Sequence, residues 1–296
     1  MVLHMTTDVE EYCALALAPV AGTGYAALPE KLLALEQELS TKERRGAAPF
    51  NKRLLIFLLQ EFSLSESPWK LPKCVALLYG AQLKRLQFTA TNKPDRYFSF
   101  QNDPFRKDLA ILLHRLIPFG AEFANPHSGI PRSLAIKGGP RQAIRFLRAT
   151  AASRGTRPFL ELHMHPEVKE AFHPAGWLEC YEHLADFLQL NPSLRGVQST
   201  SWFLDPKLVR VSPRLAYLRE VPEQCGAYIL FAGADREGKS GALATSPTRR
   251  RLYASGDYQP RLFTRIWPVA HILRRQWRQF QPPSGTMRPD SAVPVD

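Results

Sequence analysis

Three ionisable side chains, Glu161, His163 and His165, occupy alternate positions in the middle of the segment FLELHMHPE, residues 159–167. Alternate side chains of a β-strand share a face, so Glu161, His163 and His165 are expected to lie together. Imidazole titrates near neutral pH and serves as a general base, and two imidazoles beside a carboxylate also form a set that binds zinc. The segment therefore predicts a His/Glu general base or a divalent metal site, with a solvated strand end as the third interpretation.

The pair His163 and His165 resembles the His-x-His motif of the metal-dependent amidohydrolases. The resemblance covers only this short segment. It implies a metal-dependent hydrolase that uses Glu161, His163 and His165, with Asp205 or His173 completing the metal shell. The alternative interpretation of Asp205 is a turn residue before Pro206.

A second chemical signal lies in SLAIKGGPRQAIRFLR, residues 133–148. We expect a strand at 134–136, then a helix that opens at Gly138 and Gly139 and runs to about residue 150. Free N–H groups and the positive end of the helix dipole favour phosphate at a helix amino terminus. Gly138, Gly139 and Arg141 are thus predicted to contact a phosphate-bearing cofactor, unless they form only a glycine-rich turn and a basic helix face.

The segment GADREGKS, residues 233–240, matches the phosphate-binding loop pattern after an apolar run that predicts a strand. A nucleotide-binding loop needs a long helix after its Lys-Ser pair, but Gly241 weakens a helix here and Pro247 ends it. We therefore interpret the segment as a charged loop and not as a nucleotide triphosphatase motif. Lys239 remains a predicted contact for an anionic ligand.

The pattern of apolar runs predicts the architecture around these residues. Helices are expected near 30–39, 51–62 and 72–86, and later ones near 176–190 and 248–253. Strands are expected at 158–165, 197–204, 227–232 and 263–269. The expected class is α/β, with a mainly parallel or mixed open sheet flanked by helices and a helical N-terminal region. The expected parts are a helical region at 1–104, an α/β domain at 105–280 that holds the site, and a disordered tail at 281–296.

Parallel strands place their carboxyl ends along one sheet edge, where open α/β sheets bind ligands. On that expectation His163, His165, Asp205 and the 138–141 turn would surround one cleft.

The composition favours an anionic partner. The formal net charge is +12, and the four cysteines form no Cys-x-x-Cys pair. The amino-terminal segment lacks the features of a signal peptide, so a soluble, cytoplasmic protein is expected. The basic and aromatic segment ILRRQWRQF, residues 272–280, contains Arg274 and Arg275 and offers a surface for nucleic acid or membranes.

Three functions fit these signals. The first is an acyl or group transferase that acts on an anionic small molecule, with coenzyme A or another thioester as cofactor. The order of elements from 158 to 232 is similar to that of the GNAT acetyltransferases, although the pyrophosphate-binding motif of that family does not follow residue 165. The second is the metal-dependent hydrolase. The third is a basic, non-enzymatic protein that binds nucleic acid or a membrane surface.

Overall fold

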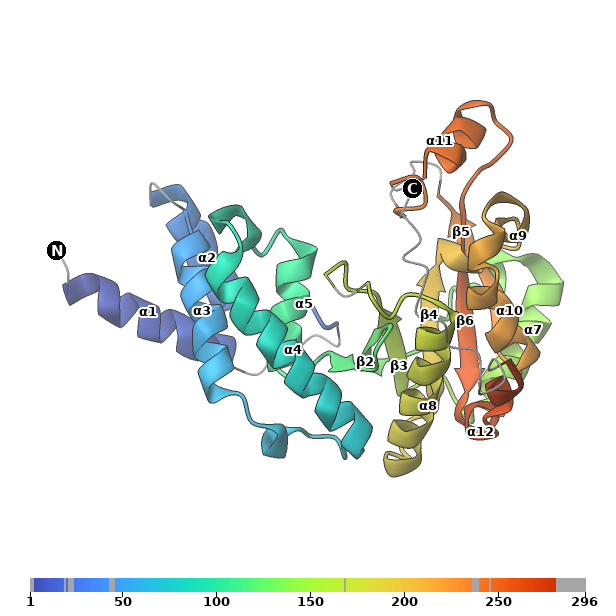
Figure 1. The fold of residues 1–296 in the computed structure, drawn as a ribbon, viewed down its shortest axis with the longest axis horizontal. Coiled ribbons are helices and arrows are strands. Elements are labelled where there is room, and N and C mark those ends of the chain that lie inside the picture. The colour runs from blue at the N-terminus through green and yellow to red at the C-terminus, as the bar shows by residue number, and fades with distance from the viewer. Residues whose placement is uncertain are drawn as a thin grey trace, which may run out of the picture. The chain divides into compact units, whose positions relative to one another are not determined.

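The computed structural model describes residues 3–18, 20, 24–42, 46–167, 169–235, 240–244 and 246–280. Its internal contacts define two compact units (Figure 1). Unit 1 comprises residues 1–128 and 163–171, and unit 2 comprises residues 129–162 and 172–296. The division at residues 104 and 280 remains a sequence-based prediction.

Unit 1 is mainly helical, and it confirms the predicted helical N-terminal region. Its core consists of apolar side chains that recur at helical spacing, such as Leu54, Leu55 and Leu58. Its elements are α1 (Leu3–Ala16), α2 (Glu30–Lys42), α3 (Ala48–Glu61), η1 (Leu64–Glu66), α4 (Lys73–Asn92), η2 (Asp95–Tyr97), α5 (Asp103–Leu112) and the antiparallel pair β1 (Ile117–Pro118) and β2 (Phe123–Ser128).

Unit 2 alternates strands with helices, as the apolar runs predict. Its elements are α6 (Leu134–Lys137), α7 (Gly139–Ala152), β3 (Phe159–His163), α8 (Pro174–Leu190), β4 (Gly196–Ser201), η3 (Trp202–Leu204), α9 (Leu208–Val211), η4 (Pro213–Leu215), α10 (Tyr217–Gln224), β5 (Tyr228–Ala234), α11 (Pro247–Ala254), β6 (Arg261–Pro268), α12 (Val269–Ile272) and η5 (Gln276–Phe280).

The strands of unit 2 follow the order β3-β4-β6-β5. Only β3 and β4 are parallel, with Leu160 opposite Val197, whereas β6 runs antiparallel to both β4 and β5. The expectation of a mainly parallel sheet is therefore wrong, and the mixed sheet is confirmed. Because two antiparallel pairings reverse the direction twice, β5 runs the same way as β3 and β4. Their carboxyl ends still share an edge, but β6 contributes its amino end there.

Residues 134–136 form helix α6, so the strand expected there is a wrong prediction. The physical reason is visible at the neighbouring edge strand. Gln142 of α7 donates to the carbonyl oxygen of Phe231 and accepts from its N–H, both at 2.8 Å, and Lys137 donates to the carbonyl of Ala232 at 2.8 Å. The helices α6 and α7 thus cover the open edge of β5, which would otherwise present unpaired backbone groups.

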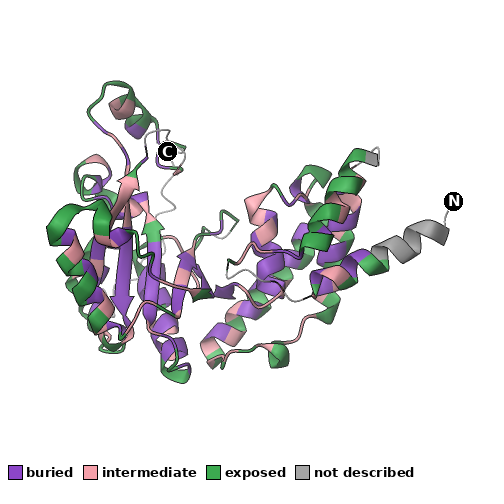
Figure 2. Ribbon diagram, turned by 180° about the vertical axis from the view of Figure 1, so that it is seen from behind, coloured by how far each residue is buried: buried purple, intermediate pink, exposed green. Residues whose placement is uncertain are grey.

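Successive side chains of β6 point to opposite faces of the unit 2 sheet. Ile266 joins the cluster that contains Phe146 of α7 and Phe159 of β3. Trp267 turns to the other face, where its ring meets Tyr181 of α8 at 5.1 Å. Unit 2 is thus layered, with α7 on one face and α8 on the other, and much of β4 and β6 carries the buried colour in Figure 2. No helix in the described part of the chain is long and apolar enough to span a bilayer.

Candidate functional site

His165 is fully buried inside unit 1, and both of its ring nitrogens are engaged. Its Nδ1 accepts the N–H of Glu167 at 3.1 Å, so Nδ1 carries no proton. Its Nε2 lies 3.0 Å from Oδ1 of Asp108 and therefore donates to that carboxylate. In this structure the imidazole links a loop to helix α5, which is a positioning role.

Asp108 is the centre of a buried polar network within unit 1. Besides His165, its carboxylate accepts from Nη2 of Arg85 at 2.7 Å and from the hydroxyl of Tyr97 at 2.6 Å. Burial by itself raises the pKa of the Asp108 carboxyl. The hydrogen bond from His165 and the charge of Arg85 outweigh burial and bring this pKa below its ordinary value. Sequence analysis missed Asp108, because its partners are far apart along the chain.

His163 and Glu161 are both half-buried on β3. The ring of His163 packs edge-on against Tyr25, with centroids 4.4 Å apart, and Glu161 lies opposite Gln198 of β4. The division of the chain assigns His163 and His165 to unit 1 and Glu161 to unit 2. Their joint role as a His/Glu base thus stays a prediction.

The metal interpretation gains no support within the described residues, where no group of three or more His, Cys, Asp or Glu side chains is placed to hold an ion. Asp205 is buried and forms an ion pair with Nη2 of Arg261 at 2.8 Å. Its Oδ1 also accepts the N–H of Lys207 at 3.0 Å, as expected for a turn-forming aspartate. The pair forms because the carboxyl end of β4 and the amino end of β6 meet at one edge.

The predicted phosphate contacts lie around the start of α7. Gly139 adopts φ +74°, and Arg141 is exposed. Gly138 has a packing reason to be glycine, because a Cβ there would lie 2.2 Å from Oε1 of Gln142, the side chain that fastens α7 to β5. Phosphate binding by these residues stays a prediction, and Lys239 lies outside the described residues.

The described end of the segment GADREGKS is a turn. Ser240 donates its N–H to Asp235 at 3.0 Å, residues 242–244 form a turn, and α11 begins only at Pro247. This is the interruption that Gly241 and Pro247 predict, and it differs from the continuous helix of a nucleotide-binding loop.

The basic and aromatic segment at 272–280 makes most of its polar side-chain contacts with helix α8. Arg278 donates to Glu182 at 2.8 Å through both Nε and Nη2, Trp277 donates to it at 2.8 Å, and Arg275 pairs with both Glu182 and Asp186. The hydrogen bond from Arg278, followed by those from Trp277 and Arg275, lowers the pKa of Glu182 to about 2 despite its partial burial. These contacts fasten η5 onto α8.

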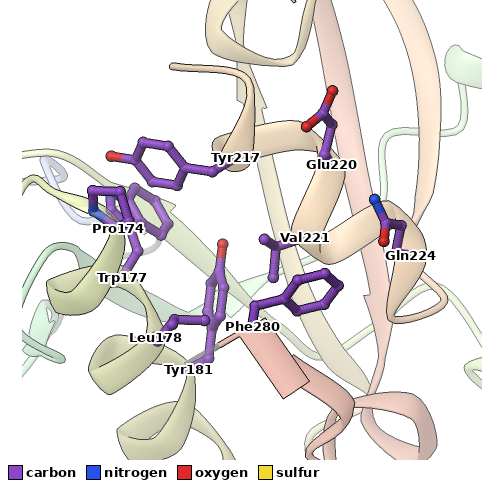
Figure 3. A pocket seen from close by; sticks show the side chains of 9 residues that line it. All are labelled: Pro174, Trp177, Leu178, Tyr181, Tyr217, Glu220, Val221, Gln224 and Phe280. Carbon is purple, nitrogen blue, oxygen red and sulfur yellow. The ribbon is translucent and has the colours of Figure 1, made fainter. Parts of the chain in front are cut away.

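A cavity of about 250 Å³ opens beside this junction, entirely within unit 2 (Figure 3). Three elements form it: the amino-terminal half of α8, the helix α10 and the end of η5. Its lining residues are Pro174, Trp177, Leu178, Tyr181, Tyr217, Glu220, Val221, Gln224 and Phe280.

The lining is apolar at its centre and polar at its periphery. Val221 and Phe280 lie beside the ring of Tyr181, whereas the carboxylate of Glu220 points away from them (Figure 3). Burial raises the pKa of the Tyr181 and Tyr217 hydroxyls, so both stay neutral near pH 7. The pocket therefore suits a neutral, apolar group with at most a few hydrogen-bonding atoms.

Sequence analysis predicted the helix near 176–190 but not this pocket. The helical spacing of Trp177 and Tyr181 is the signal that indicates the buried side of α8. Val221 and Phe280 gave no comparable signal, because they meet α8 only through tertiary packing. The spacing of Leu218 and Val221 in α10 is the one local pattern that indicates an inward face there.

No family model matches this chain, and no curated protein matches it significantly. One solved structure is similar, described as the crystal structure of an acyltransferase in complex with decanoyl-CoA. The similarity covers 75% of this chain and 78% of that chain, with a TM-score of 0.41 and 15% sequence identity. At this level the similarity supports no argument about the site or the activity.

Proposed function

We propose that this protein is an acyl-group transferase whose pocket between α8, α10 and η5 receives the apolar acyl group of a thioester, such as an acyl-coenzyme A. In the reaction, an amine or hydroxyl of the acceptor forms a bond to the thioester carbonyl carbon, the C–S bond breaks, and the acceptor's proton leaves with the thiol. The observation that carries the proposal is the apolar, aromatic lining of the pocket.

The size of the pocket supports a ligand that enters only in part. Pockets that enclose a whole drug-sized ligand measure about 300–1,000 Å³, and this one measures about 250 Å³. An acyl chain or a small aromatic group fits such a volume, whereas a complete coenzyme does not. The polar part of the thioester would then lie outside the pocket.

The charges near the pocket support the same assignment. Glu220 is the acidic residue of the lining, and its carboxylate disfavours an anionic group inside. The cations of the neighbouring elements already have partners, since Arg219 pairs with Glu223 at 3.1 Å and Arg278 with Glu182 at 2.8 Å. The phosphates of a coenzyme therefore need other contacts.

The predicted catalytic and cofactor residues are proposals for that polar half of the reaction. Glu161, which belongs to the same unit as the pocket, is the proposed base. His163 and His165 belong to unit 1, and His165, with both ring nitrogens engaged, is proposed only to position its loop. Gly138, Gly139, Arg141 and Lys239 are the proposed phosphate contacts, and Asp205 is proposed to position this edge of the sheet through its pair with Arg261.

The test is the binding of a series of acyl-coenzyme A thioesters from two to twelve carbons, measured by calorimetry, together with thiol release in the presence of amine acceptors. Each added methylene buried in the pocket is worth about 0.8 kcal/mol, or roughly fourfold in affinity, until the pocket is full. Val221→Trp fills the pocket and is expected to weaken long-chain binding at least about tenfold.

Leu190→Trp is the matched control, because Leu190 lies at the far end of α8 and is 42% exposed. This variant should bind like the unchanged protein. Circular dichroism and thermal unfolding of both variants establish that they fold. The proposal fails if no thioester binds saturably, or if the two tryptophan variants behave alike.

A further inference from the structure

The outward side of helix α7 exposes large aliphatic residues. Its inward side is buried through Gln142, Phe146 and Ala149. On the opposite side, Ile144 and Leu147 are 52% and 65% exposed, and they are neighbours at i and i+3. Figure 2 draws this outer side of α7 largely in the exposed colour.

Helix α6 extends the exposed aliphatic surface. Ile136 is 83% exposed, the largest exposed fraction among the large apolar residues of the described chain. It lies on α6, which packs against α7. Single exposed aliphatic residues are common in proteins, but several on one pair of adjacent helices indicate an interaction surface. We call Ile136, Ile144 and Leu147, with the cations around them, the α7 face.

Positive charge surrounds these aliphatic residues without acidic residues among them. Residues 123–160 include seven Lys and Arg and no Asp or Glu. On the α7 face, Arg141, Arg145 and Arg148 are exposed. Arg145 lies 3.8 Å from Glu223, but both side chains are well exposed and such a pair is weak. Lys137 donates to the backbone carbonyl of Ala232, a neutral group that does not offset its positive charge.

We propose that the α7 face binds the surface of a membrane rich in anionic lipid. Aliphatic side chains flanked by arginines are the composition of helices that lie in the interface plane, where the apolar groups enter the acyl boundary and the cations meet lipid phosphates. A nucleic acid offers the same phosphates, but it offers no apolar phase for Ile136, Ile144 and Leu147. A bilayer also adapts to a convex helix without a preformed complementary groove.

This inference does not rest on the acyl pocket, which lies among α8, α10 and η5 and contains no residue of the α7 face. Arg141 is shared with the proposed phosphate contacts, so the variant I144S/L147S is the one that separates the two proposals. Loss of thioester binding would leave the α7 face unaffected. Loss of membrane binding in I144S/L147S should likewise leave thioester binding unchanged, because neither residue lines the pocket.

The test is co-sedimentation of the full chain with phosphatidylcholine vesicles, with and without about one-third phosphatidylserine, at low and high salt. Each cation near an anionic surface strengthens binding about fivefold, so the triple variant R141Q/R145Q/R148Q should bind phosphatidylserine vesicles about 100-fold more weakly. The double variant I144S/L147S should lose binding while keeping the full charge. Because these side chains are exposed, the variants should fold, and circular dichroism checks this.

The matched control is R210Q/R251Q/R274Q, which removes the same charge from exposed positions elsewhere in unit 2. If this control still binds phosphatidylserine vesicles, the binding depends on the α7 face and not on the total charge. Equal loss in both triple variants would reduce the effect to net charge and overturn the proposal.

Besides a dimer without vesicle binding, two further outcomes would overturn the proposal. One is equal binding to vesicles with and without phosphatidylserine. The other is binding to duplex DNA that depends on the three arginines and is indifferent to I144S/L147S. If light scattering shows a dimer that I144S/L147S disrupts and no vesicle binding, the face joins two copies of the chain and the membrane assignment is wrong.

Discussion

Two arginine-containing regions of unit 2 look alike in sequence and differ in structure. Around α8, Arg275 and Arg278 bind Glu182, and Asp186 adds a second carboxylate. Along α7, Arg141 and Arg148 face solvent beside exposed aliphatic residues. The difference is the presence of carboxylates across the packing interface. A cluster of basic residues is thus structural where the element packed against it carries carboxylates. Where that element carries none, the cluster is available to bind a partner.

This comparison changes the assignment of the basic segments. The segment at 272–280 combines arginines with aromatic residues and is the more conspicuous candidate for a polyanion in the sequence. In the structure Trp277 is fully buried and donates to Glu182 at 2.8 Å, so most of the segment serves to fasten η5 onto α8. The less conspicuous helix α7 is the one that keeps its charges exposed.

The largest expected loss of stability is at Asp108 in unit 1, where an arginine pairs with a fully buried carboxylate. Asp108→Ala removes the carboxylate that pairs with Arg85 and His165, and leaves a partly buried guanidinium without its counter-charge. Removing one partner of a buried ion pair costs about 3–5 kcal/mol. Urea unfolding of this variant measures the loss. Asp95→Ala, at an exposed position, is the control and should stay within about 0.5 kcal/mol.

A smaller effect is expected at the α8 junction. Glu182→Ala removes the acceptor of Trp277, Arg275 and Arg278, and a hydrogen bond to a charged group contributes about 1.5–3 kcal/mol. We expect a loss of about 2 kcal/mol in the free energy of unfolding. Glu179→Ala, on the exposed side of the same helix, should change it by less than about 0.5 kcal/mol. Equal effects of the two substitutions would contradict the contrast between the two arginine regions.

The contacts of Glu182 at this junction predict that the free energy of unfolding depends on pH. The pKa of Glu182 is about 2 in the folded protein, compared with about 4.3 for an unperturbed glutamate. Its folded pKa is depressed, so the stabilisation is fully present above about pH 4.3 and is lost as the pH falls through about 2. The difference in unfolding free energy between the unchanged protein and Glu182→Gln should be constant above pH 5 and shrink toward pH 2. A difference that is independent of pH would show that the charge of Glu182 contributes nothing.

The smallest effect on stability is expected on α7. The triple variant R141Q/R145Q/R148Q should change the free energy of unfolding by no more than about 0.5 kcal/mol, because these side chains make no buried contact. Thermal unfolding in parallel with Glu182→Ala measures the contrast. A loss of unfolding free energy comparable to that of Glu182→Ala would show that the three arginines of α7 are structural.

Local patterns explain which parts of the fold were predictable. The spacing of Trp177, Cys180, Tyr181 and Leu184 indicates the buried side of α8, because helix periodicity is a property of a short segment. The same local reasoning failed at 134–136, where three apolar residues suit a buried strand as well as a helix. Their actual conformation depends on the open edge of β5, about 95 residues further along the chain.

The sequence alone determined the alternation of helices and strands, the class of the fold and the interruption after Ser240, since each depends on neighbouring residues. Only the tertiary structure decided the antiparallel direction of β6, the pairing of His165 with Asp108 and the meeting of Tyr181, Val221 and Phe280 in one pocket. It also decided which arginines meet a carboxylate. The physical reason is that burial, electrostatic pairing and cavity shape arise between segments that are remote in the chain, and no local spacing records them.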